Sequence, residues 1–138
     1  MWRLGLVLAA MLIIASPAAA KQDARAVVTF ESDSDALTPA AVERITAFAR
    51  EVRGLSDKSV KVEAHATLAE SEGSSPEYAV GLSQRRANTV RSALVEAGVP
   101  PGEIVNRAFG SRRPLPGVAA ASPTQRRVEI SLGDGAGW

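Results

Sequence analysis

Segments of two different hydrophobic periods alternate along this chain, and their order constrains the fold more than any other feature. Val60, Val62, Ala64 and Ala66 alternate with polar residues, which indicates a strand with one buried face. On both sides of that segment, apolar residues recur every three or four positions, as they do in amphipathic helices. A chain that switches between these periods builds a sheet with helices packed against it.

The residues before this strand predict a first strand and a first helix. Residues 26–30 are β-branched and apolar, which is typical of a strand. Thr38 and Pro39 match the N-cap and first position of a helix. Its expected apolar face comprises Val42, Ile45, Ala49 and Val52, with Phe48 beside the face and Gly54 after the last turn.

The residues after the strand predict a second helix and two more strands. Ser83 is the expected N-cap of the helix. Its buried stripe comprises Ala87, Val90, Leu94 and Ala97, and Gly98 follows. Strands are expected at residues 104–109 and around residues 128–132, joined by an irregular connection at residues 110–123.

This order of elements predicts the fold class. Strand, helix, strand, helix, strand and strand follow one another. We expect an α/β fold (an α+β sandwich) in which one mixed sheet has both helices packed on one face. The chain is long enough for one such domain.

The first 20 residues have the features of a secretory signal peptide. Arg3 precedes an uncharged apolar run at residues 4–14, and small residues at positions 18–20 precede Lys21. We expect cleavage after Ala20 and a periplasmic location. The alternative is a retained membrane anchor, although a span needs roughly 20 apolar residues.

Cleavage leaves residues 21–138 as a single domain, with a core at 26–132 and a disordered tail at 133–138. The loss of Arg3 leaves 15 basic and 15 acidic side chains, a balance that argues against nucleic-acid or membrane-surface binding. The sequence contains no Cys, so a lipid anchor, a disulfide framework and a thiolate metal site are not expected. We expect no cofactor, and oligomeric state stays open.

Four short motifs give the chain a family resemblance. They are the loop at residues 75–78 (Ser-Pro-Glu-Tyr), Leu82, Ser83, Arg86 and Ala87 in the second helix, His65 at the end of a strand, and Arg126 and Arg127 before the last strand. Together they resemble the OmpA-like domain, and most closely that of the peptidoglycan-associated lipoproteins. The resemblance covers roughly residues 26–132 and implies the order β-α-β-α-β-β.

The resemblance implies a non-catalytic module that binds the diaminopimelate stem of peptidoglycan. Arg86 corresponds to the family's arginine for the ligand, because a guanidinium offers a fixed fork of donors to a carboxylate. The other site residues that the resemblance implies are Leu82, Thr67, His65 and Phe30. We expect His65 to hydrogen-bond nearby groups and Phe30 to belong mainly to the core.

A structural role for Arg86 stays open. In a structural role, Arg86 would be solvated or paired with Glu77 or Glu63. A binding role is favoured because an arginine near a helix start is unfavourable against the helix dipole. Arg126 and Arg127 either brace the loop around the site or are plain edge-strand charges.

Two departures from the family pattern weaken the expected site. Thr67 stands where the family has an Asp for the ligand's amino group, and Ala79 stands where it has an Asn. The exchange of a charged contact for a neutral one weakens the binding free energy of the ligand by about 1–2 kcal/mol. Glu70 or another loop carboxylate can replace the missing Asp. The alternative function is therefore an OmpA-like scaffold for other envelope proteins with an eroded peptidoglycan site.

An enzymatic role has little support in the sequence. The chain has one His and no Cys nucleophile, and no catalytic motif accompanies that His.

Overall fold

The computed structural model describes residues 24–55, 58–70 and 75–133. The predicted signal peptide at residues 1–20, with its cleavage site, lies outside the described residues, as does the tail at 134–138. The elements are β1 (Arg25–Thr29), α2 (Pro39–Val52), β2 (Ser59–Ala64), α3 (Pro76–Glu96), β3 (Ile104–Ala108) and β4 (Arg127–Gly133), with 3-10 turns at Pro101–Glu103 and Pro123–Gln125. The predicted order β-α-β-α-β-β is confirmed.

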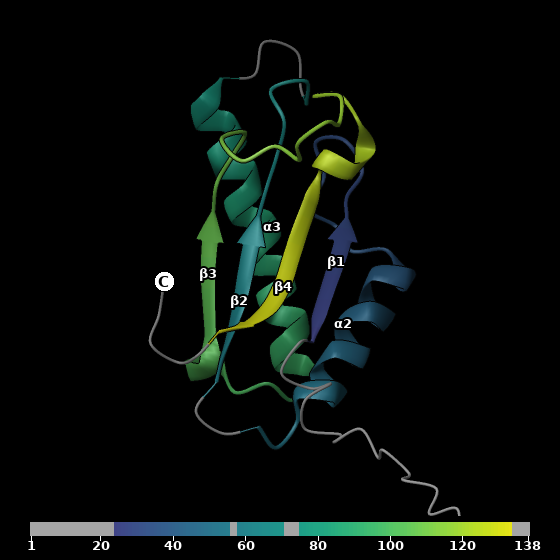
Figure 1. Cartoon of the computed structure of the whole chain (residues 1–138), viewed down its shortest axis with the longest axis vertical. Helices are drawn as coiled ribbons and strands as arrows, with labels where there is room; N and C mark the ends of the chain where they lie inside the picture. The colour runs from purple at the N-terminus through teal and green to yellow at the C-terminus, as the bar shows by residue number, and fades with distance from the viewer. Residues whose placement is uncertain (1–23, 56–57, 71–74, 134–138) are drawn as a thin grey trace, which may run out of the picture.

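The four strands form one mixed sheet in the order β1-β4-β2-β3 (Figure 1). β4 pairs antiparallel with both β1 and β2, and β3 runs parallel to β2. Val62 lies opposite Ile130 across β2 and β4, so these two side chains share a face. Gly133 ends β4, which corrects the expectation that the disordered tail begins at this residue.

Helix α2 begins as its sequence predicts. Thr38 is the N-cap, and its hydroxyl accepts a hydrogen bond from the main-chain N–H of Ala41 at 3.1 Å. The expected position of Val42 on the buried face is wrong, since its side chain is 44% exposed. Phe48 instead belongs to the buried face. The buried residues recur at the helical spacing Ala41, Ile45, Phe48, Ala49 and Val52, and Val42 lies beside this stripe.

Helix α3 begins two turns earlier than predicted. Ser75 is the N-cap, with its hydroxyl oxygen 3.2 Å from the main-chain nitrogen of Tyr78, and Pro76 occupies the first turn. The assignment of Ser83 as N-cap is therefore wrong. Ser83 is buried inside the helix, where its hydroxyl donates to the Val80 carbonyl and accepts from the N–H of Gly110. The sequence Ser75-Pro76 carries the same cap signal as Thr38-Pro39.

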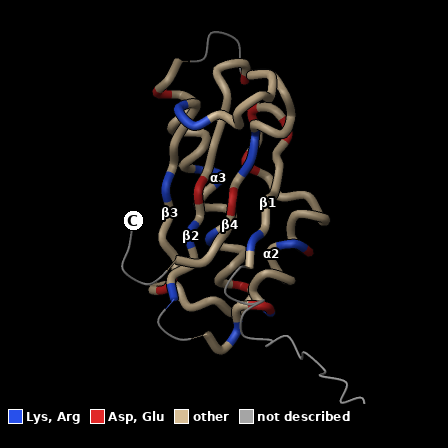
Figure 2. The backbone as a smooth tube through the Cα atoms, in the orientation of Figure 1, with Lys and Arg blue, Asp and Glu red and all other residues tan. Residues whose placement is uncertain are grey.

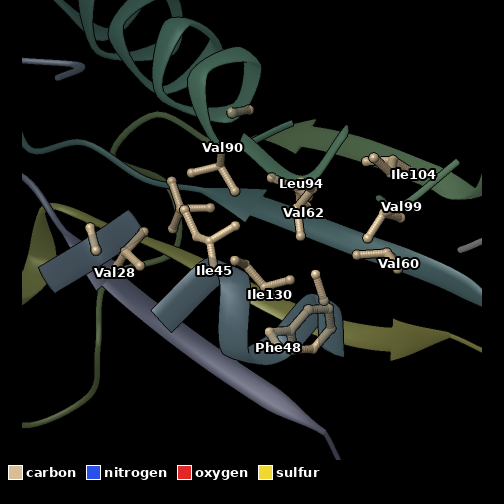
Figure 3. Packing of buried hydrophobic residues seen from close by; sticks show 14 of the residues in the cluster. Val28, Ile45, Phe48, Val60, Val62, Val90, Leu94, Val99, Ile104 and Ile130 are labelled. Carbon is tan, nitrogen blue, oxygen red and sulfur yellow. The ribbon is translucent and has the colours of Figure 1, made fainter. Parts of the chain in front are cut away.

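Both helices pack against one face of the sheet, as expected. The core joins Ile45 and Phe48 of α2 and Val90 and Leu94 of α3 to alternate strand residues such as Val62 (Figure 3). Each of these side chains is at most 2% exposed. The α/β sandwich predicted from periodicity is confirmed.

The described helices also bear on the membrane question. None within residues 24–55, 58–70 and 75–133 combines the length and hydropathy that a membrane span requires.

Candidate functional site

The five predicted site residues converge at one end of the sheet. Phe30 follows β1, His65 and Thr67 follow β2, and α3 contributes Leu82 and Arg86. All five are buried, with exposed fractions between 0% for Arg86 and Leu82 and 7% for Thr67. The sequence therefore predicts which residues lie together, but the structure places them beneath the surface rather than on it.

Arg86 is fully buried and holds three chain segments through main-chain oxygens. Its Nε donates to the carbonyl of Ser34 at 2.8 Å, Nη1 to that of His65 at 3.1 Å, and Nη2 to that of Glu31 at 3.1 Å. The guanidinium carbon lies 5.1 Å from the centre of the Phe30 ring, within the range of a cation–π contact. Arg86 thereby fixes the turn after β1 and the end of β2.

The two remaining N–H groups of Arg86 bind Glu70. Nη1 donates to Oε2 at 3.0 Å, and Nη2 donates to Oε1. Glu70 is only 1% exposed. This bidentate fork is the geometry in which a guanidinium recognises a carboxylate most strongly. The predicted pairing of Arg86 with Glu77 or Glu63 is wrong, because the partner is Glu70.

Two main-chain donors complete the environment of the Glu70 carboxylate. The N–H of Asp33 donates to Oε1 at 3.1 Å, and the N–H of Thr67 donates to Oε2 at 2.9 Å. Each oxygen therefore accepts two hydrogen bonds. We call these donors, the Arg86 fork and the N–H groups of Asp33 and Thr67, the carboxylate site.

The turn that supplies the Asp33 N–H is conformationally unusual. Asp33 has φ = 58°, a left-handed conformation that Asp adopts more readily than most residues. Its carboxylate accepts a hydrogen bond from the Tyr78 hydroxyl at 2.8 Å, which ties the turn to the first turn of α3. The site thus depends on Tyr78, which lies in one of the sequence motifs, and on Asp33, which lies in none of them.

Arg86 lies well inside α3 rather than near its start. Because α3 begins at Pro76, Arg86 lies in the third turn, where the helix dipole has little effect. The expectation that Arg86 opposes the dipole at the helix start is therefore wrong. The burial of Arg86 and its five hydrogen bonds show instead that it organises the carboxylate site.

His65 is buried, and its ring nitrogen Nε2 lies 3.2 Å from Glu129 Oε2. Its imidazole stacks on Phe109, with ring centres 5.4 Å apart, and Nδ1 has no hydrogen-bond partner within the described part of the chain. Its main chain makes hydrogen bonds of the expected kind: the N–H donates to the Arg127 carbonyl at 2.9 Å, and the carbonyl accepts from Arg86 Nη1 at 3.1 Å. Burial and the positive charge of Arg127 lower the pKa of His65 to about 4, against the opposing effect of Glu129, so His65 is neutral at pH 7.

The two arginines at the start of β4 brace the surrounding loops, as one of the two expectations had it. Arg126 Nε donates to the Phe30 carbonyl at 2.9 Å, and Arg127 Nη2 donates to the Arg113 carbonyl at 3.2 Å. Figure 2 shows that β4 begins with basic residues and becomes acidic at its middle, where Glu129 lies opposite Glu63 of β2.

Thr67 also borders a small pocket on the outside of the carboxylate site. The pocket has a volume of about 140 Å³ and is mainly apolar, with Leu68, Ser111, Pro114 and Gln125 among its lining residues. Leu68 is 51% exposed. Within the described residues, no group of three or more His, Asp or Glu side chains could hold a metal ion.

A comparison with protein families matches residues 29–128 to the OmpA family. The chain belongs to the OmpA family. It is 34% identical over 113 residues to the peptidoglycan-associated lipoprotein of Pseudomonas aeruginosa, which covers 77% of this chain and 62% of that protein. It is 33% identical over 107 residues to the probable lipoprotein YiaD of Escherichia coli, or 76% of this chain and 47% of YiaD. The chain thus spans about half to two thirds of the length of these relatives.

Solved structures of OmpA-like domains share the fold. The peptidoglycan-associated lipoprotein of Burkholderia pseudomallei superposes with a TM-score of 0.66 at 25% identity, over 78% of this chain and 89% of that one. The OmpA-like domain of FopA1 from Francisella tularensis gives a TM-score of 0.72 at 23% identity, over 79% and 70% of the two chains. Two of these four proteins are named as peptidoglycan-associated lipoproteins, and none of the four names refers to a catalysed reaction.

Proposed function

We propose that this OmpA-family chain is a non-catalytic periplasmic module that associates non-covalently with peptidoglycan through the diaminopimelate stem. One observation carries the proposal, namely that the end of the sheet holds a carboxylate with four convergent donors. Diaminopimelate has a free carboxylate at the end of its side chain. The printed name of the relative from Pseudomonas aeruginosa, a peptidoglycan-associated lipoprotein, supports the same ligand.

The surroundings of the carboxylate site suit the rest of this ligand. The small apolar pocket bordered by Thr67 and Leu68 has room for the methylene chain of diaminopimelate, whose burial is favourable. Thr67 offers no negative charge to the ligand's ammonium group. We therefore expect weaker binding than in relatives that have an Asp at this position, by about 1–2 kcal/mol.

Co-sedimentation with two kinds of purified cell-wall sacculi tests this proposal without any mutation. One kind contains diaminopimelate, and the other contains lysine, which lacks the second carboxylate. We expect the protein to pellet with the first kind and to stay in the supernatant with the second. Equal pelleting with both would show that the diaminopimelate carboxylate is not recognised.

The complete pairing of Arg86 supports a second candidate function. All five of its N–H groups already have partners inside the protein, so none is left for a ligand. A scaffold for other envelope proteins would not need a free donor at this site. A folded protein that pellets with neither kind of sacculus would favour this alternative. Cross-linking in intact cells, followed by mass spectrometry, would then identify the partners.

We also propose that residues 1–20 are removed on export and that residues 21–138 form the single mature domain. The apolar run at residues 4–14 and the small residues before Lys21 support this processing. The intact mass of the protein recovered from the periplasm tests it. An N-terminus at Met1 would instead indicate a retained anchor.

A further inference from the structure

The carboxylate site is built by groups that do not depend on Glu70. Arg86 is anchored by the carbonyls of Ser34, His65 and Glu31, and the N–H groups of Asp33 and Thr67 belong to two separate turns. Removal of the Glu70 side chain therefore leaves an Arg86 fork that is still oriented by three hydrogen bonds. Such a preorganised set of donors binds an external anion without reordering the chain.

Glu70 reaches the site from a short turn. Its main-chain N–H donates to the carbonyl of Thr67 at 3.3 Å, so the carboxylate folds back over residues just before it in the sequence. Its side chain is the element whose departure frees the four donors. An incoming carboxylate would then replace the negative charge that Arg86 loses, which avoids an unpaired buried cation.

We propose that Glu70 is an internal competitor that occupies the site of the ligand carboxylate, so that only a charged carboxylate can displace it. This inference builds on the proposed function and specifies its ligand. All four contacts to the carboxylate are donors, whereas a carboxamide presents an NH₂ group that cannot accept a hydrogen bond. The site therefore selects diaminopimelate with a free carboxylate over its amidated form.

Chemical rescue of a Glu70→Ala variant tests the competition directly. Loss of one partner of a buried ion pair predicts a fall in Tm on the order of 15 °C. We expect sodium acetate to raise the Tm of this variant with the logarithm of its concentration. Sodium chloride at the same ionic strength and acetamide at the same concentration should not raise it.

Two control proteins define the specific effect. The wild-type protein and Glu77→Ala, which removes an exposed carboxylate from the first turn of α3, should respond equally to acetate and chloride. A folded Glu70→Ala protein that acetate does not stabilise beyond chloride, or that acetamide stabilises as well, would overturn the inference.

Glu70→Gln keeps the test decisive if the alanine variant does not fold. Its amide fills the site but places an NH₂ group against donors, so we expect acetate to displace it and to raise its Tm more than that of the wild-type protein. Equal responses of Glu70→Gln and the wild-type protein would overturn the inference.

Sedimentation separates this inference from the proposed function. We expect Glu70→Gln to bind diaminopimelate sacculi at least several-fold more tightly than the wild-type protein, and amidated sacculi no better. Acetate rescue without any pelleting would support the carboxylate site and refute the wall ligand. Pelleting of the wild-type protein without acetate rescue would support wall binding by another surface and refute the role of Glu70.

Discussion

Replacement of Arg86 by Met should destabilise the whole domain. Met retains much of the aliphatic volume but none of the five hydrogen bonds. Glu70, only 1% exposed, would keep a buried charge without its cation. Breaking a buried pair in this way costs about 3–5 kcal/mol, and the stability of a typical domain is only about 5–15 kcal/mol.

The size of this loss can be measured by urea unfolding followed by far-UV circular dichroism. We expect a lower midpoint with an unchanged m-value, which reports a change in stability alone. A double variant, Glu70→Met with Arg86→Met, removes both charges and should cost less than the sum of the single variants by about 1–3 kcal/mol. A cost below about 1 kcal/mol for Arg86→Met, or strict additivity, would refute the view that this pair is a coupled unit.

Three further predictions concern stability. The pKa of His65 is about 4 in the folded protein against 6.5 unfolded, so neutral His65 contributes about 3 kcal/mol to the free energy of unfolding above pH 6.5, and this contribution is lost as the pH falls to 4. Urea unfolding between these pH values should show a smaller loss of stability for His65→Gln than for the wild-type protein, and parallel curves would contradict this prediction. Thr38→Ala should cost about 1 kcal/mol by removing the cap to the Ala41 N–H, whereas Thr38→Ser should cost little; equal thermal melts of both variants would exclude a capping effect. Gly110→Ala should cost about 1–3 kcal/mol, because φ is 57° and the new Cβ would lie 2.9 Å from Val80 Cγ2; a wild-type midpoint in urea would count against this strain.

Local patterns predict the fold well because each element has its own signal. Alternation around Val62 and the cap at Thr38 depend on neighbouring residues in the sequence, so they can be recognised without knowledge of the fold. Residue type alone does not decide where α3 starts, because Ser75 and Ser83 are both acceptable caps. Pro76 after Ser75 was the available signal, since proline is favoured in the first helical turn.

The candidate site is less predictable because its decisive contacts are long-range. The motif around Leu82 and the position of His65 locate the right end of the sheet, but nothing in the sequence pairs Glu70 with Arg86. These two residues are 16 positions apart and meet only when the loop after β2 folds over α3. Glu70 resembles any solvated acid in a polar loop, and its burial is a property of tertiary structure.

The central place of β4 in the sheet has a consequence for how this chain folds. β4 separates β1 from β2 and pairs with both, so the first and last strands of the domain meet directly, as Arg25 does with Ser131. Pairing between residues so far apart in the sequence slows folding, because the entropy of closing the intervening chain is lost before the strands can pair. The complete sheet therefore forms only once β4 is available, because β1 has no other strand partner.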